Sequence, residues 1–249
     1  MISFDVSRGK INDAAISTEL AKIVGEFCTM MEWADKYRKL SIRTNADNPR
    51  DASVAFSFGA EGVGLCRTEH MFFEADRIPA VREMIVSSTT AEREKALKKL
   101  LPMQKKDFKG IFKAMKGRPV TIRFLDPPLH EFLPHEDDEI KALAKEMKLS
   151  FESLKATVES LHEFNPMMGH RGLRLAVTYP EIAEMQTQAV IEAAITVKKE
   201  NGYDIVPEIM IPLYCDAKEF NYVHDIVTNK ADEIITKEVV KLTYKMLTI

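Results

Sequence analysis

The sequence has few cysteines and no long apolar run. Its 249 residues include three cysteines, Cys28, Cys66 and Cys215, and none of them stands in a C-x-x-C pair. An odd cysteine count without that spacing argues against a disulfide framework and against structural zinc, and it indicates a reducing compartment. No stretch approaches the roughly 18 apolar residues that a membrane-spanning helix requires. We therefore expect no membrane partner.

A large excess of charge is also missing. The formal net charge is −3, which gives no reason to expect a nucleic-acid partner. The first ten residues lack the apolar segment of a secretory signal, so we expect a cytoplasmic protein. The nucleotide-binding loops G-x-x-x-x-G-K-[ST] and G-x-G-x-x-G are absent. The histidines have no zinc-ligand spacing such as H-E-x-x-H, which argues against a zinc enzyme.

Short β-rich segments alternate with longer helical ones, which predicts an α/β fold with a parallel sheet. Right-handed crossovers then leave either a TIM-type (β/α) barrel or a doubly wound sheet. Helices are expected over residues 12–38, 49–58 and 90–116. Strands are expected over residues 40–44, 62–66, 119–125, 206–213 and 239–249.

The chain is expected to have two parts. Residues 1–39 are interpreted as an N-terminal helical lead-in, and residues 40–249 as the domain that carries the sheet. The segment from about 127 to 179 is too long for an ordinary loop. We predict that it is an insertion with its own small structure, including a charged helical stretch over residues 137–163.

Polar residues follow the predicted strands, where parallel sheets place their binding loops. Residues 45–47 follow the first strand, Arg67 follows the second, and Arg123 lies near the end of the third. Two arginines at the same edge of a sheet can clamp a carboxylate or a phosphate. The alternative is that each arginine pairs with a nearby Glu69 or Asp126 as scaffolding.

A further polar cluster spans residues 165–174, where Arg171 and Arg174 alternate with Gly169 and Gly172. Glycines permit backbone conformations that other residues avoid. One interpretation is phosphate binding at a helix N-terminus. The other is a tight turn whose arginines anchor the insertion to the barrel.

Two more residues lie on predicted strands. Cys66 is expected to be a small buried residue and not a nucleophile. Glu208 precedes an apolar run and is expected either to point into the barrel or to end a loop.

Residues 59–73, GAEGVGLCRTEHMFF, resemble the PEP-utilising enzymes. Three further stretches narrow the resemblance to the pyruvate, phosphate dikinase family, and it extends from about residue 40 to about residue 227. These stretches are residues 76–85 (DRIPAVREMI), 123–134 (RFLDPPLHEFLP) and 164–172 (FNPMMGHRG).

The resemblance implies part of a C-terminal PEP/pyruvate-binding (β/α) barrel, with about five of its eight strands and a helical insertion after the third. It implies that Arg67 and Arg123 hold the phosphoryl and carboxylate groups of PEP or pyruvate. We name Arg67, Arg123, Asp126 and Arg171 as substrate-binding candidates and assign no catalytic residue. The implied reaction interconverts ATP, pyruvate and phosphate with AMP, PEP and diphosphate through a phosphohistidine on a separate domain, and it uses Mg²⁺.

Departures from the family pattern limit these expectations. Residues 244–249, YKMLTI, contain no glutamate where the family has a magnesium ligand, so we expect the Mg²⁺ ligands to be missing from this chain. The expected partners are PEP or pyruvate, the phosphohistidine and ATP-binding domains of a dikinase, and a second copy, because an open barrel exposes strand edges. The isolated chain is expected to be inactive. The alternative is a truncated, non-catalytic relative that acts as a PEP-binding or protein-interaction module.

Overall fold

The computed structural model describes residues 2–5, 9–16 and 22–249. The chain divides into two compact units, residues 1–41 and residues 42–249. A domain boundary between residues 39 and 40 stays a prediction. Within the described residues, no helix combines the length and the apolar character needed to cross a bilayer.

The first unit contains a short hairpin and one helix. Strand β1 (Ser3–Asp5) pairs antiparallel with β2 (Lys10–Asn12), and α1 spans Glu26–Tyr37. The helix predicted over residues 12–38 is therefore wrong in its first part: residues 10–12 are in a strand, and the helix begins after Gly25 at φ 60°. Part of that prediction, residues 17–21, lies outside the described residues.

The second unit is built on a five-stranded parallel sheet whose strands are adjacent in chain order, β3-β4-β5-β6-β7. All five predicted strands are present; four are shorter than expected, and β4 has the expected length but begins and ends one residue later. The strands are β3 (Thr44–Asn45), β4 (Val63–Arg67), β5 (Val120–Arg123), β6 (Pro207–Ile211) and β7 (Lys245–Thr248). The parallel α/β prediction is confirmed. The described strands do not close into a barrel, and the arrangement is consistent with part of one.

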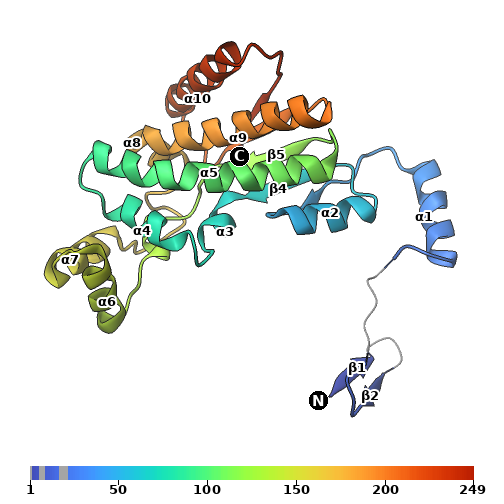
Figure 1. The fold of residues 1–249 in the computed structure, drawn as a ribbon, viewed down its shortest axis with the longest axis horizontal. Coiled ribbons are helices and arrows are strands. Elements are labelled where there is room, and N and C mark those ends of the chain that lie inside the picture. Colours follow the sequence, from blue (N-terminus) through green and yellow to red (C-terminus); the bar gives the residue numbers. More distant parts are fainter. Residues whose placement is uncertain (1, 6–8, 17–21) are drawn as a thin grey trace. The chain divides into compact units, whose positions relative to one another are not determined.

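Helices connect the strands, and long α5 and α9 lie side by side over one face of the sheet (Figure 1). Local capping explains where several begin: Asn48 caps α2, and Thr89 and Glu92 form a capping box at α5. The helices are α2 (Pro49–Ser57), α3 (Thr68–Phe72), α4 (Ile78–Val86), α5 (Thr90–Met115), η1 (Leu129–Phe132), α6 (Asp137–Met147), α7 (Phe151–Leu161), α8 (Gly172–Thr178), α9 (Pro180–Asn201) and α10 (Ala217–Lys237).

The main core fills the space between the sheet and its covering helices. Ile122 of β5 and Ile209 of β6 point into it and pack in one cluster with Phe108 and Phe112 of α5. Burial of this apolar surface is the dominant favourable term in folding. Cys66 of β4 is also buried there, as predicted, and burial raises the pKa of its thiol.

The predicted insertion contains α6 and α7 in place of one continuous helical stretch. The break is at Lys148, whose φ of 58° ends α6, and the side chain of Ser150 caps α7. Leu143 and Leu154 of this pair join a second apolar cluster with residues of α4 and η1. The same cluster includes residues of α5 and α9, so the insertion packs against the neighbouring helices in a second core.

A polar network lies on the sheet face opposite to the main core. Glu208 is 4% exposed, accepts hydrogen bonds from Arg43 Nη1 (2.5 Å) and Thr121 Oγ1 (2.7 Å), and lies 3.6 Å from Lys245 Nζ. Glu208 lies within strand β6, so the alternative that placed it at the end of a loop is wrong. Burial acts to raise the pKa of its carboxyl, but Arg43, Thr121 and Lys245 outweigh burial, so the pKa is lowered.

Replacement of this carboxylate should have a pH-dependent effect. Because the folded pKa is lowered, the stabilisation is present above the unfolded pKa of about 4.3 and is lost as pH falls through the folded value. Glu208→Gln should therefore lower the free energy of unfolding at pH 7, with a smaller difference from wild type at about pH 3. Urea titrations at both pH values measure this, with exposed Glu152→Gln as the control. Equal differences at the two pH values would contradict the assigned role.

Candidate functional site

Two arginines end neighbouring strands at the same level of the sheet. Arg67 is the last residue of β4, Arg123 is the last residue of β5, and the two are paired in the parallel register. Paired positions on adjacent strands lie on the same face, about 5 Å apart. The structure therefore brings together the two arginines that the sequence places at strand ends.

Arg123 is held between two buried carboxylates. Its Nη2 donates to Glu69, and its Nη1 lies 2.9 Å from Asp126 Oδ2. Glu69 and Asp126 are 5% and 4% exposed, so the pairs are shielded from water. These are the contacts of the scaffolding alternative, and Arg123 makes them with both carboxylates at once.

Asp126 also binds a second arginine. Arg171 donates from Nη2 to Oδ2 (2.7 Å) and from Nε to Oδ1 (3.2 Å), while the backbone N–H of Gly172 donates to the Asp126 carbonyl (3.0 Å). Arg174 donates to the carbonyls of Met168 and Gly169. The arginines of residues 165–174 thus anchor the turn and join the insertion to the end of β5.

Arg67 differs from the other two arginines. No carboxylate pairs with its guanidinium in the part of the chain that the structure describes. Its backbone N–H donates to Asp47 Oδ1 (2.6 Å), and the other Asp47 oxygen lies 2.7 Å from His70 Nδ1. Asp47 therefore fixes the backbone of Arg67 and leaves its side chain available.

We call Arg67, Glu69, Arg123, Asp126 and Arg171 the strand-end cluster. It contains three guanidiniums and two carboxylates: Glu69 pairs with Arg123, and Asp126 pairs with both Arg123 and Arg171. Within this cluster, the guanidinium of Arg67 is the one without a carboxylate partner among the described residues. Such a group attracts an anion.

The described residues show no preformed magnesium site. They contain no group of three histidine, cysteine, aspartate or glutamate residues that could hold a metal ion. Glu69 and Asp126, the carboxylates nearest the arginines, are committed to ion pairs. Mg²⁺ favours carboxylate oxygens, so these pairs would have to break before either residue could coordinate it.

One polar residue of this region has no motif in the sequence. Gln186 of α9 is 1% exposed and bonds to residues that follow both Arg67 and Arg123. The only sequence signal is its place on a helix face that is otherwise apolar, between Met185 and Ala189. A polar side chain on such a face needs hydrogen-bond partners.

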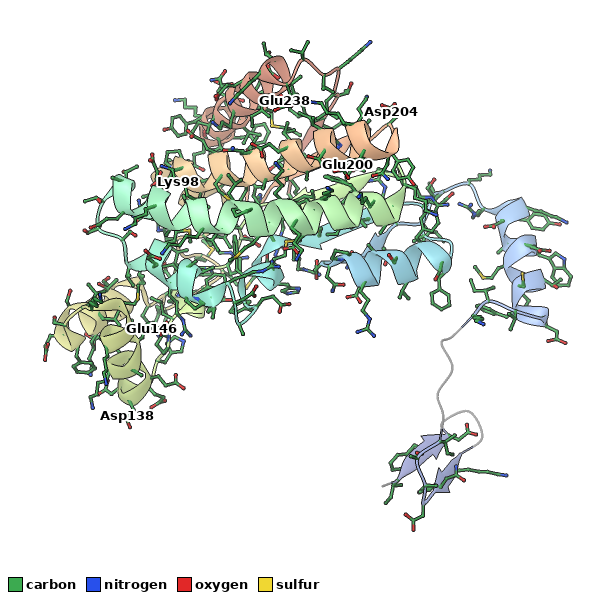
Figure 2. All side chains as sticks on the ribbon, viewed as in Figure 1. Lys98, Asp138, Glu146, Glu200, Asp204 and Glu238 are labelled. Carbon is green, nitrogen blue, oxygen red and sulfur yellow. The ribbon has the colours of Figure 1, made fainter. Side chains whose placement is uncertain are left out.

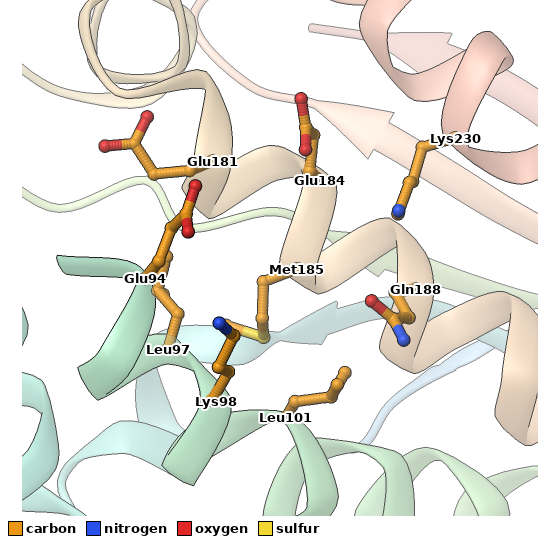
Figure 3. Close-up of a pocket in the computed structure, with 9 residues that line it drawn as sticks. All are labelled: Glu94, Leu97, Lys98, Leu101, Glu181, Glu184, Met185, Gln188 and Lys230. Carbon is orange, nitrogen blue, oxygen red and sulfur yellow. The ribbon is translucent and has the colours of Figure 1, made fainter. Parts of the chain in front are cut away.

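A pocket of about 170 Å³ opens elsewhere, among α5, α9 and α10 (Figure 3). Its walls carry both signs of charge, with Glu94 and Lys98 from α5, Glu184 from α9 and Lys230 from α10. None of the predicted site residues lines it. The pocket is therefore separate from the strand-end cluster.

Comparison with known proteins identifies the family. The family described as "PEP-utilising enzyme, PEP-binding domain" matches residues 21–247. The chain belongs to the PEP-utilising enzymes. Among curated relatives, it is 56% identical to pyruvate, phosphate dikinase of Clostridium symbiosum over 94% of this chain, 51% identical to that of Giardia intestinalis over 98%, and 49% identical to that of Rhizobium meliloti over 98%.

The resemblance to a segment of the dikinases is thus confirmed. The chain spans about a quarter of the length of these relatives, 27% or 28% of each. In this member of the PEP-utilising enzymes the cluster lies at the carboxyl ends of the strands, the edge where parallel α/β proteins bind their ligands.

Loss of the shared carboxylate should destabilise the cluster. Asp126→Asn leaves Arg123 and Arg171 without their common partner, and we expect the free energy of unfolding to fall by about 2–3 kcal/mol. Asp138→Asn is the control, because Asp138 projects from α6 with 97% of its side chain exposed (Figure 2) and should change nothing measurable. Urea denaturation measures both. Equal stability of the two variants would show that the Asp126 pairs contribute little.

Proposed function

We propose that this chain is an anion-binding segment of a PEP-binding domain and that its ligand is PEP or pyruvate. The observation that carries the proposal is Arg67: its guanidinium has no carboxylate partner among the described residues and stands beside Arg123 at the carboxyl end of the sheet. A partly buried guanidinium without a counter-ion favours a carboxylate or phosphoryl group.

The arginines take different roles in this proposal. Arg67 makes the first contact with the anion, and Arg123 adds positive potential while it stays bound to Glu69 and Asp126. Asp126 repels an anion by its own charge, so it acts by orienting Arg123 and Arg171. Arg171 belongs to the insertion and is held at the same edge of the sheet by its ion pair with Asp126.

The neighbouring side chains suit a small organic acid. The register that pairs Arg67 with Arg123 continues to Met210 of β6 and Leu247 of β7, which are half-buried and apolar. A ligand with an acidic end and a short carbon end, such as PEP or pyruvate, matches this row. A larger polyanion would make no favourable contact with the apolar side chains of Met210 and Leu247.

At the level of the whole enzyme, we propose the dikinase reaction: ATP, pyruvate and phosphate exchange with AMP, PEP and diphosphate through a phosphohistidine. The support is the identity of 49–56% to pyruvate, phosphate dikinases over about a quarter of their length. The phosphohistidine and ATP-binding domains would be its partners, and Mg²⁺ would require ligands beyond those described. The isolated chain is proposed to bind PEP or pyruvate without turnover, and its proposed location is the cytoplasm. We also propose that it self-associates through the open edges of β3 and β7.

A second candidate function is a non-catalytic PEP sensor or interaction module. It is favoured by the ion pairs that already neutralise Arg123 and Arg171, because they reduce the potential available to a ligand. As a sensor it predicts PEP binding and as an interaction module it predicts none; in both forms it predicts no gain of activity when the remaining dikinase domains are supplied.

Removal of the unpaired guanidinium should weaken ligand binding. Arg67→Ala should lower the affinity for PEP and for oxalate by about 2 kcal/mol, roughly 30-fold, because a charge-assisted contact is lost. Calorimetric titration measures this with and without Mg²⁺. Arg50→Ala is the control, since Arg50 is an exposed arginine of α2 and its loss changes the net charge equally. Unchanged affinity in Arg67→Ala would refute the proposed role.

A further inference from the structure

A single buried glutamine contacts both strand ends that carry the arginines. The Nε2 of Gln186 donates to Thr68 Oγ1 (3.0 Å), and its Oε1 accepts from the backbone N–H of Leu125 (2.9 Å). Thr68 directly follows Arg67, and Leu125 comes shortly after Arg123. The Gln186 side chain, from α9, therefore links the segment after β4 to the segment after β5.

This bond takes over where the strand pairing stops. Arg67 and Arg123 are the last paired residues of β4 and β5, after which β4 turns into α3. The next backbone amide of β5, at Phe124, donates to Met210 of β6. The Leu125 N–H is left without a strand partner in a residue that is 3% exposed, and a buried amide requires an acceptor. Gln186 supplies that acceptor.

Water has little room to replace the glutamine. Thr68 is fully buried, and Gln186 is 1% exposed. The cavity that Gln186 and Leu125 help to line measures about 10 Å³, which is at the lower limit for one water molecule. Loss of the amide would leave the Leu125 N–H without a partner, and the segments could relieve this by moving apart.

We propose that Gln186 is a positioning residue of the anion site, which sets the separation of the Arg67 and Arg123 guanidiniums by tying the two strand ends together. It contacts neither arginine's ligand and acts through Thr68 and Leu125. This inference deepens the proposed function and rests on it for the ligand. The bridge itself is tested separately below.

The first comparison uses two buried glutamines of the 249-residue chain. Gln186→Leu removes both bonds with little change of volume and should weaken PEP binding about tenfold. Gln104→Leu is the matched control: Gln104 is also 1% exposed, on α5, and its amide has no hydrogen-bond partner among the described residues. Calorimetric titration should show wild-type affinity in this control. Equal affinity in both variants overturns the proposal.

The second comparison asks whether the bond, and not the core in general, matters. Thr68→Val removes the hydroxyl that Gln186 contacts, and Thr68→Ser keeps it. PEP affinity should fall in Thr68→Val and recover in Thr68→Ser. The Thr68→Val effect should largely vanish in the Gln186→Leu background. Full additivity overturns the bridge. If Gln186→Leu does not fold, the threonine pair decides alone, since it alters only one of the two bonds.

A readout without ligand keeps the two proposals apart. Hydrogen exchange at the Leu125 amide should be slow in wild type and Gln104→Leu, and faster in Gln186→Leu. Unchanged protection in Gln186→Leu overturns the bridge whatever the affinity. Faster exchange with unchanged PEP affinity shows a bridge that does not position the site, which also overturns the proposal. If wild-type chain binds no PEP, the proposed function fails, while the exchange comparison still decides on the bridge.

Discussion

The ion pairs of Arg123 join three parts of the second unit: the end of β5, the helix after β4 and, through Asp126 and Arg171, the insertion. Opposite charges attract more strongly in a shielded site than in water. Glu69, from the short helix after β4, and Asp126, from the loop after β5, supply the opposing charge to Arg123. Asp126 also accepts hydrogen bonds from Arg171 at both of its oxygens, sharing Oδ2 with Arg123, so the insertion is fixed to the sheet by the same carboxylate.

The result is an asymmetric pair of arginines. Arg123 is immobilised in a shielded network, whereas Arg67 is fixed only through its backbone, by Asp47. A guanidinium held in place before the ligand arrives costs no reorganisation on binding, and one without a counter-ion offers the stronger attraction. The cluster combines the two properties in neighbouring side chains, which a site with two free arginines or two paired arginines would not achieve.

The sequence predicted the strands because each is a short apolar run followed by polar residues, and it predicted Arg67 and Arg123 because parallel strands deliver their ends to one edge. It did not predict which arginine would be neutralised, since Glu69 and Asp126 both lie within reach of either and only the packed fold selects Arg123. Gln186 had no local motif because its partners are 118 and 61 positions away in the chain. The predicted helix began at residue 12, although pairing with Ser3 places that residue at the end of a strand and α1 begins only at Glu26.

The uncovered face of the sheet explains how five strands can stand without closing. On the helix side, Ile122 and Ile209 are fully buried. On the opposite side, the row of Thr121, Glu208 and Lys245 forms a charged network at one level, and the row of Arg67 and Arg123 forms the second at the strand ends. Charged groups paired with one another tolerate both water and a covering layer. The paired charges of these rows therefore keep much of this face polar, and Gln186 of α9, reaching from the helix side, ties together the two strand ends on which the anion site depends.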